Sequence, residues 1–142
     1  MPIRPYLDFD GRADEAIAFY QRALGAELRF LMRLGESPEP PPPGMVPPGS
    51  EQKVMHADLL IGDAQVMISD GRCSGRPNFA GVNLNLALPD AAAAERAFAA
   101  LADGGQVTMP IGPTFFAPCF GMVTDRFGLP WMIMVDAPMP AA

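Results

Sequence analysis

Residues 5–28 read PYLDFDGRADEAIAFYQRALGAEL, and this stretch holds the pattern that decides the fold. Polar and apolar side chains alternate in its first part, which predicts a strand over residues 3–9 with one buried face. Apolar residues then recur at spacings of three and four, which predicts an amphipathic helix over residues 13–24 that ends at Gly25. A second strand is predicted over residues 26–34.

The same order of elements returns in the second half of the chain. Residues 83–105 read NLNLALPDAAAAERAFAALADGG, an alternating strand followed by an alanine-rich helix and two glycines. At an offset of 79 residues, Leu7 corresponds to Leu86 and Phe19 to Phe98. A period of this length indicates that one supersecondary unit is duplicated. One unit of about 60–70 residues buries little apolar surface, so we expect the two units to share a sheet or core.

Further strands complete a β-α-β-β-β order in each half. They are predicted at residues 53–61, 65–69, 82–88, 106–111, 120–124 and 129–135. The predicted fold class is α+β, with two curved, mixed or antiparallel sheets that each carry a helix on one face and leave the other face to a cavity. We expect a single domain over residues 1–142, with module one at about 1–75 and module two at about 76–142.

A proline-rich segment interrupts the first module. Residues 35–50 read GESPEPPPPGMVPPGS and contain seven prolines without apolar periodicity. Proline removes backbone donors, so this segment is expected to be an exposed loop with polyproline character rather than a strand. A tolerated insertion is the simplest interpretation, because long loops cost little stability. A lid and a docking motif for a proline-recognition domain are the alternatives.

Composition narrows the class of function. The chain has 142 residues, of which 49% are hydrophobic and 18% charged, which is typical of a globular protein. Its net charge of -6 argues against nucleic-acid binding, which needs a basic face. No apolar run is long enough for a membrane span, and the charged N-terminus is unlike a secretion signal, so we expect a cytoplasmic protein. The two cysteines, Cys73 and Cys119, are too few for a disulfide framework.

Three stretches resemble one family when taken together. They are residues 5–28, HADLLIGDAQVMISD at residues 56–70 and FGMVTDRFGLPWMI at residues 120–133. With the doubled β-α-β-β-β order, they resemble the vicinal oxygen chelate superfamily of glyoxalase I, extradiol dioxygenases and bleomycin- and fosfomycin-resistance proteins, and within it the PhnB-like branch. The resemblance covers the chain apart from the proline-rich segment. It implies a glyoxalase-like fold, cavities built from two modules, and a homodimer.

The resemblance also implies a metal site, which this sequence does not reproduce. Metal-using members hold one divalent ion with a His from the first strand of each module and a Glu or similar residue from the last strand of each. The matching residues here are Arg4 or Pro5 and Asn83, and the last strands, 66–69 and 131–134, contain no carboxylate. Such a site requires imidazole or oxygen donors that point into one cavity. We therefore predict no cofactor, with a divalent metal at an altered site as the less favoured alternative.

His56 is the only histidine and is the one candidate for catalysis or metal binding. It shares a strand face with Asp58. Three interpretations are open: a histidine in the cavity wall or bonded within the sheet, a general base oriented by Asp58, and an atypical metal site that adds Asp70. A spacing of two residues along a strand separates side chains by about 7 Å, which predicts a loose pairing. Neither cysteine is favoured as a nucleophile.

Polar residues on two other strands are candidates for ligand contact. Asn83 and Asn85 alternate with leucines, so both amides are expected to point into the cavity if the leucines pack on the helix. An exposed or dimer-facing surface is the alternative. Tyr6 and Asp8 lie opposite the predicted buried side of the first strand and are expected to line the equivalent wall.

Aromatic residues late in the chain complete the candidate site. Phe116 and Trp131 belong to a group that either stacks on a planar ligand or forms core. The full set of candidate ligand-binding residues is Tyr6, Asp8, His56, Asp58, Asn83, Asn85, Phe116 and Trp131.

The preferred function is a metal-independent small-molecule-binding protein with a largely apolar cavity. The alternative is a lyase, isomerase or dioxygenase that uses His56 as a base or ligand. Whether a reaction is catalysed is left open. The expected partners are a small molecule and a second copy of the chain, without nucleic acid or membrane. No strand is followed by the glycine-rich motif that would bind S-adenosylmethionine, although the PhnB-like branch often carries the label 3-demethylubiquinone 3-methyltransferase.

Overall fold

The computed structural model describes residues 1–136. The chain forms two compact units, of which unit 1 is Met1–Asn78 and unit 2 begins at Phe79. This division lies close to the predicted module boundary. Whether the two units make up a single domain stays a prediction.

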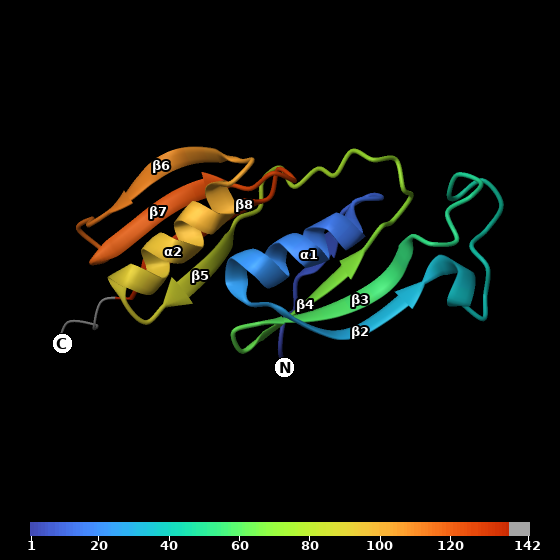
Figure 1. Cartoon of the computed structure of the whole chain (residues 1–142), viewed down its shortest axis with the longest axis horizontal. Coiled ribbons are helices and arrows are strands. Elements are labelled where there is room, and N and C mark those ends of the chain that lie inside the picture. The colour runs from blue at the N-terminus through green and yellow to red at the C-terminus, as the bar shows by residue number, and fades with distance from the viewer. Residues whose placement is uncertain (137–142) are drawn as a thin grey trace. The chain divides into compact units, whose positions relative to one another are not determined.

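Unit 1 consists of one helix and a four-stranded mixed sheet (Figure 1). Its elements are β1 (Tyr6–Asp8), α1 (Ala13–Leu24), β2 (Glu27–Arg33), the short 3-10 helix η1 (Leu34–Glu36), β3 (Val54–Ile61) and β4 (Ala64–Ser69). The strand order is β1-β4-β3-β2, with β1 parallel to β4 and the other pairs antiparallel.

Unit 2 repeats this arrangement (Figure 1). Its elements are β5 (Leu84–Leu88), α2 (Ala91–Ala102), β6 (Gln106–Gly112), β7 (Cys119–Thr124) and β8 (Pro130–Val135). The order β5-β8-β7-β6 again contains one parallel pair, β5 with β8. The predicted fold class, α+β with two β-α-β-β-β modules, is confirmed.

A buried carboxylate fixes the start of helix α1. The first helical residue, Ala13, donates its backbone N–H to Asp70 Oδ1 at 2.8 Å, and Gly11 N–H donates to the same oxygen at 2.9 Å. The helix ends at Gly25, whose φ of 66° is the left-handed conformation that glycine adopts without strain. An acceptor 57 residues away in sequence therefore caps α1 and ties it to the end of β4.

Each helix covers one face of its own sheet. In unit 1, Phe9, Tyr20 and Leu59 are almost completely buried between α1 and the strands. In unit 2, Phe98 of α2 packs directly over Gly121 of β7, where an added Cβ would lie only 2.7 Å from the Phe98 ring. The α2 helix begins at a local cap, since Asp90 Oδ1 accepts the Ala93 N–H at 2.8 Å.

Two strands begin at least two residues later than the sequence predicts. β1 begins at Tyr6 rather than at Ile3, and Pro5 joins the sheet only through its carbonyl, which accepts the Met67 N–H at 2.9 Å. Proline has no N–H to offer the ladder, which explains the short strand. β5 begins at Leu84 rather than at Val82.

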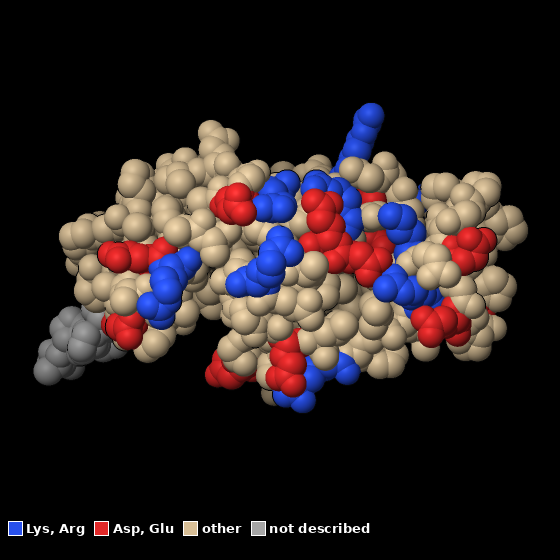
Figure 2. All heavy atoms as spheres, viewed as in Figure 1, with Lys and Arg blue, Asp and Glu red and all other residues tan. Residues whose placement is uncertain are grey.

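Charge is mixed on the surface seen in Figure 2. Acidic and basic side chains lie interspersed on that face, where an extended basic stripe would be expected of a nucleic-acid binder. In the part of the chain that the structure describes, no helix has the length and apolar character needed to cross a bilayer.

Candidate functional site

The unit 1 sheet face that points away from α1 carries half of the predicted site residues. Directly paired residues share a sheet face, and one such row runs through Phe30, Asp58, Met67 and Tyr6. The helix side is buried, whereas Tyr6 and Phe30 remain 55% and 45% exposed. We define the open face of unit 1 as Tyr6, Asp8, Phe30, His56, Asp58 and Met67.

Two aromatic rings flank His56 on this open face. The ring centroid of Tyr6 lies 5.8 Å from that of His56, and the centroid of Phe30 lies 6.2 Å from it on tilted planes. His56 Nε2 is 2.9 Å from Asp58 Oδ1. The predicted loose pairing is therefore wrong, because the two side chains lean toward each other along β3.

The contact with Asp58 determines how His56 can act. In neutral His56, a carboxylate acceptor next to Nε2 favours the tautomer that carries its proton on that nitrogen. Nδ1 is then left as a hydrogen-bond acceptor. The side chains of His56 and Asp58 are only 27% and 24% exposed, so water competes weakly for this contact.

Asp8 lies at the edge of the open face in a more crowded setting. Partial loss of water around its carboxyl group raises the pKa of Asp8, and the negative charges of Asp10 and Asp70 raise it further. The Asp10 N–H donates to Asp8 Oδ1 at 2.8 Å and opposes this effect. Gly71, with a φ of 51°, packs so closely that a Cβ there would collide with the Asp8 carboxylate.

Asp70 does not join His56 and Asp58 in a metal site. Its carboxylate is fully buried and accepts three backbone N–H groups, from Gly11, Ala13 and Val54. Among residues 1–136, no group of three or more His, Cys, Asp or Glu side chains is placed to hold a metal ion. The atypical metal set considered from the sequence is therefore not assembled, because Asp70 is used to hold the fold.

The donor chemistry of the last strands does not fit the metal site of the superfamily either. On the side away from the helices, β4 presents Gln65, Met67 and Ser69, and β8 presents Met132 and Met134. Amide, hydroxyl and thioether groups are poor substitutes for the carboxylate ligands that such a site needs.

The unit 2 candidates form a separate group. Asn85 of β5 lies away from α2, and its Nδ2 donates to Met134 Sδ at 3.2 Å. Phe116 precedes β7 and packs edge-on against Phe120, with ring centroids 4.9 Å apart. Phe120 shares the face of its pairing partner Met134. Asn85 and Phe116 are thus both associated with the face of the unit 2 sheet that α2 leaves open.

Asn83 and Trp131 depart from this grouping. Asn83 is exposed and precedes β5, so it has no place in the strand ladder. Trp131 is only 3% exposed and lies on the α2 side of β8, where its Nε1–H donates to the buried Asp125 at 2.9 Å. We therefore omit Trp131 from the candidate site, because its core position and its hydrogen bond hold it away from the open side of the sheet.

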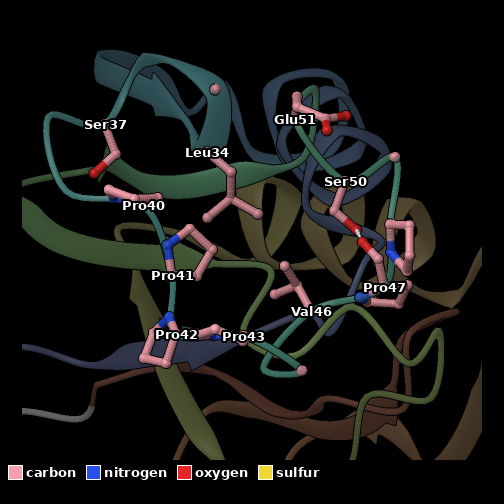
Figure 3. Close-up of a pocket in the computed structure, with 14 residues that line it drawn as sticks. Leu34, Ser37, Pro40, Pro41, Pro42, Pro43, Val46, Pro47, Ser50 and Glu51 are labelled. Atoms are coloured by element: carbon pink, nitrogen blue, oxygen red, sulfur yellow. Dashed lines mark hydrogen bonds between the residues drawn. The ribbon is translucent and has the colours of Figure 1, made fainter.

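The proline-rich segment encloses a hollow of about 380 Å³ (Figure 3). Proline rings and Val46 line it, and on one side of it Ser50 Oγ donates to the Pro47 carbonyl at 2.6 Å. A second hollow of about 360 Å³ lies between this segment and residues of the sheet, including Met55 and Ser69. The segment thus lies beside the start of β3 and the end of β4, and most of it is exposed and irregular beyond η1.

Neither cysteine is set up as a nucleophile. Burial raises the pKa of the Cys73 thiol, and the charge of Asp70 raises it further. Burial likewise raises the pKa of Cys119. Both thiols are therefore protonated at neutral pH, which is the unreactive form.

Two members of the open face were missed by sequence reasoning. Phe30 faces Asp58 only because the pairing of β2 with β3 shifts between Leu28 and Phe30. This irregularity breaks the alternation that would have revealed the face of Phe30. Met67 could have been found, because its pairing with the first strand follows from the β-α-β-β-β order.

Comparison with known proteins identifies the family. Residues 6–133 match the Glyoxalase/Bleomycin resistance protein/Dioxygenase superfamily, and the chain belongs to it. Protein YjdN of Escherichia coli (strain K12) is 40% identical over 147 residues, covering 99% of both chains. The predicted superfamily is confirmed.

Solved structures agree with this assignment. The crystal structure of protein PA1353 from Pseudomonas aeruginosa is 41% identical and matches with a TM-score of 0.82 over 96% of this chain and 98% of that one. A PhnB protein from Bacillus cereus, described as a putative 3-demethylubiquinone-9 3-methyltransferase, is 26% identical with a TM-score of 0.77, over 95% and 99% of the two chains. The predicted likeness to the PhnB-like branch is confirmed by this second structure.

Proposed function

We propose that this chain binds a planar, largely apolar small molecule on the open face of unit 1 and needs no metal ion to do so. The observation that carries the proposal is the group of three neighbouring rings, Tyr6, Phe30 and His56, two of which are about half exposed. Exposed apolar groups clustered on one sheet face are typical of binding surfaces. Aromatic rings also offer favourable contacts to a flat ligand.

The polar groups beside the rings support a binding role. The contact between His56 and Asp58 leaves His56 Nδ1 as an acceptor that can orient a ligand hydroxyl or N–H group. A few fixed polar groups in an apolar surrounding are the usual composition of a small-molecule site. The donor sets of β4 and β8 do not fit the metal centre of the superfamily, which favours binding without metal.

Titration with N-phenyl-1-naphthylamine, an uncharged aromatic fluorophore, tests this proposal. Replacing Tyr6 and Phe30 together by Ala is expected to weaken binding at least 10-fold, since each ring contributes about 1 kcal/mol. Phe115→Ala is the matched control, because it removes a fully exposed ring from unit 2. Unchanged affinity in the double variant, or a loss caused by Phe115→Ala, would contradict the proposal.

The contact between His56 and Asp58 also favours a second candidate, an enzyme in which His56 removes a proton. Asp58 would hold the imidazole in one tautomer, with Nδ1 as the base. His56→Ala separates the candidates. Weaker ligand binding in this variant, with no reaction detected in the wild type, supports a binding protein, whereas a wild-type reaction that is lost in this variant supports the enzyme.

We propose in addition that the protein acts as a homodimer, as its family implies. Besides the proposed ligand-binding rings, edge strands β2 and β6 leave apolar side chains exposed, namely Leu28, Val107 and Met109. Sedimentation equilibrium is expected to give twice the chain mass of 15.1 kDa. A monomer mass at micromolar concentration would contradict a stable dimer.

A further inference from the structure

A hollow of about 300 Å³ lies at the corner of unit 1 next to the open face. Its lining includes Arg72, Ser74, Arg76, Asn78, Asp8 and Asp10. Asp8 belongs to both the hollow and the open face. Tyr6 is two residues earlier on the same side of β1, which places it about 7 Å from Asp8 along the strand.

The loop that carries the two arginines is held in one conformation. Asp10 binds it through both carboxylate oxygens: Oδ1 accepts the Ser74 N–H at 3.0 Å, and Oδ2 accepts the Ser74 hydroxyl and the Arg76 N–H. Asp10 and Cys73 adopt positive φ angles of 52° and 60°, which are uncommon for residues other than glycine. Side chains mounted on such a fixed loop lose little backbone entropy when they bind a ligand.

Both guanidinium groups in this hollow remain available. Within residues 1–136, neither Arg72 nor Arg76 forms an ion pair or a side-chain hydrogen bond. The exposed Arg4, Arg22 and Arg96 are likewise without an ion pair in this range but lie outside the hollow, whereas Arg12, Arg29, Arg33 and Arg126 pair with carboxylates. The Asp10 oxygens already accept hydrogen bonds from the loop, and Asp8 Oδ1 accepts the Asp10 N–H. The carboxylates beside the arginines are therefore engaged locally rather than in ion pairs.

We propose that Arg72 and Arg76 bind an oxyanion, a carboxylate or phosphate-type group, of the ligand whose planar body lies on the open face. Guanidinium groups donate paired hydrogen bonds that match the geometry of such oxyanions. The ligand class is thus a planar apolar molecule with an anionic group at one end. This inference rests on the proposed function and adds the charge of the ligand to it.

Two fluorophores that differ by one sulfonate test the proposal. Arg72→Gln combined with Arg76→Gln is expected to weaken binding of 8-anilinonaphthalene-1-sulfonate about 10-fold or more. Binding of N-phenyl-1-naphthylamine, which lacks the sulfonate, should stay within about twofold. The control combines Arg22→Gln with Arg96→Gln, two exposed arginines outside the hollow, and makes the same change in net charge. Unchanged sulfonate binding, equal losses for both fluorophores, or an equal loss in the control would overturn the proposal.

A titration with inorganic phosphate examines the arginines without the aromatic face. We expect the NMR signals of the Nε–H groups of Arg72 and Arg76 to shift, with those of Arg22 and Arg96 unmoved. No shift, or equal shifts at all four, would overturn the anion site. If phosphate shifts the signals of Arg72 and Arg76 but the protein does not bind N-phenyl-1-naphthylamine, only the proposed function is contradicted.

Discussion

Unit 1 and unit 2 share an order of elements and a strand order, yet they use their buried acidic groups differently. In unit 1, Asp70 joins three backbone segments by accepting N–H groups from Gly11, Ala13 and Val54. In unit 2, Asp125 accepts the Phe127 and Leu129 N–H groups of its own turn and the Trp131 indole. The two units therefore share a fold although their buried aspartates accept hydrogen bonds from different parts of the structure.

The sheet faces that the helices leave open also carry different side chains in the two units. Unit 1 presents aromatic rings beside a His–Asp contact, whereas unit 2 presents Asn85 among methionines and the Phe116 ring against Phe120, with no His–Asp contact among the described residues. Polar groups beside stacked rings can orient a ligand, while methionines adapt to many shapes. The difference therefore favours unit 1 as the site of the proposed ligand binding.

Asp70→Ala is expected to have the largest effect on stability. It leaves three N–H groups buried without their acceptor, so the free energy of unfolding should fall by about 3–5 kcal/mol. Urea unfolding followed by circular dichroism measures this loss. Asp70→Asn is the control, because its amide oxygen can still accept from Gly11 and Ala13, and it should lose less. A loss below about 1 kcal/mol would show that Asp70 does not anchor unit 1.

Gly121→Ala is the corresponding test of unit 2. The added methyl group would overlap the Phe98 ring and Ile111, so the free energy of unfolding should fall by about 1–3 kcal/mol. Trp131, the only tryptophan, reports unfolding of unit 2 by fluorescence. Gly112→Ala is the control, since nothing lies within 4 Å of a Cβ at that position. Equal stability of the two variants would contradict the close packing of α2 on β7.

Asp90→Ala should cost less than Asp70→Ala, because Asp90 provides only a local cap to α2. Loss of its contact with the Ala93 N–H is expected to lower the free energy of unfolding by about 1 kcal/mol. Asp90→Ser keeps a capping oxygen and should restore most of the stability. If Asp90→Ala lowered the free energy of unfolding as much as Asp70→Ala, the distinction between a local cap and a carboxylate that joins distant segments would be contradicted.

Asp8→Asn should have the smallest effect, and its sign depends on pH. Because the pKa of Asp8 is raised in the folded state, its ionised form disfavours folding at neutral pH, and the Asn variant should be slightly more stable there. Solvent screening keeps this gain below about 1 kcal/mol. As pH falls through the raised pKa to below 3.8, the ordinary value, wild-type Asp8 becomes neutral and the gain should vanish. Urea unfolding of the variant and the wild type at pH 7 and pH 3.5 measures this gain. The assignment would be contradicted if the stability of the variant, relative to that of the wild type, were lower at pH 7 than at pH 3.5.

The sequence predicted the fold well because its signals are local and repeated. The helix period, Gly25 and the alternation of the second-half strand each gave an element close to its observed bounds. The sequence also predicted that Tyr6 and Asp8 lie opposite the buried side of the first strand and that His56 and Asp58 share a strand face, and the strand register places all four on one sheet face. The ligand-binding role of these residues stays a prediction.

The rest of the site depends on features that have no local signal. Phe30 reaches the open face through a shift in strand pairing, and Asp70 is drawn into the core by N–H groups from distant segments. Trp131 lies in the core because Asp125 offers it an acceptor, which residue type alone does not reveal. Pairing shifts and long-range hydrogen bonds arise only when the chain is folded.

Metal content tests most directly the claim that the open face works without a metal ion. Untagged protein is incubated with zinc, nickel, manganese and ferrous iron, desalted, and analysed by elemental mass spectrometry, with His56→Ala as the control. The account predicts far less than one transition-metal ion per chain, in equal amounts for the wild type and the variant. About one ion per chain, lost in His56→Ala, would contradict it and would identify His56 as a metal ligand.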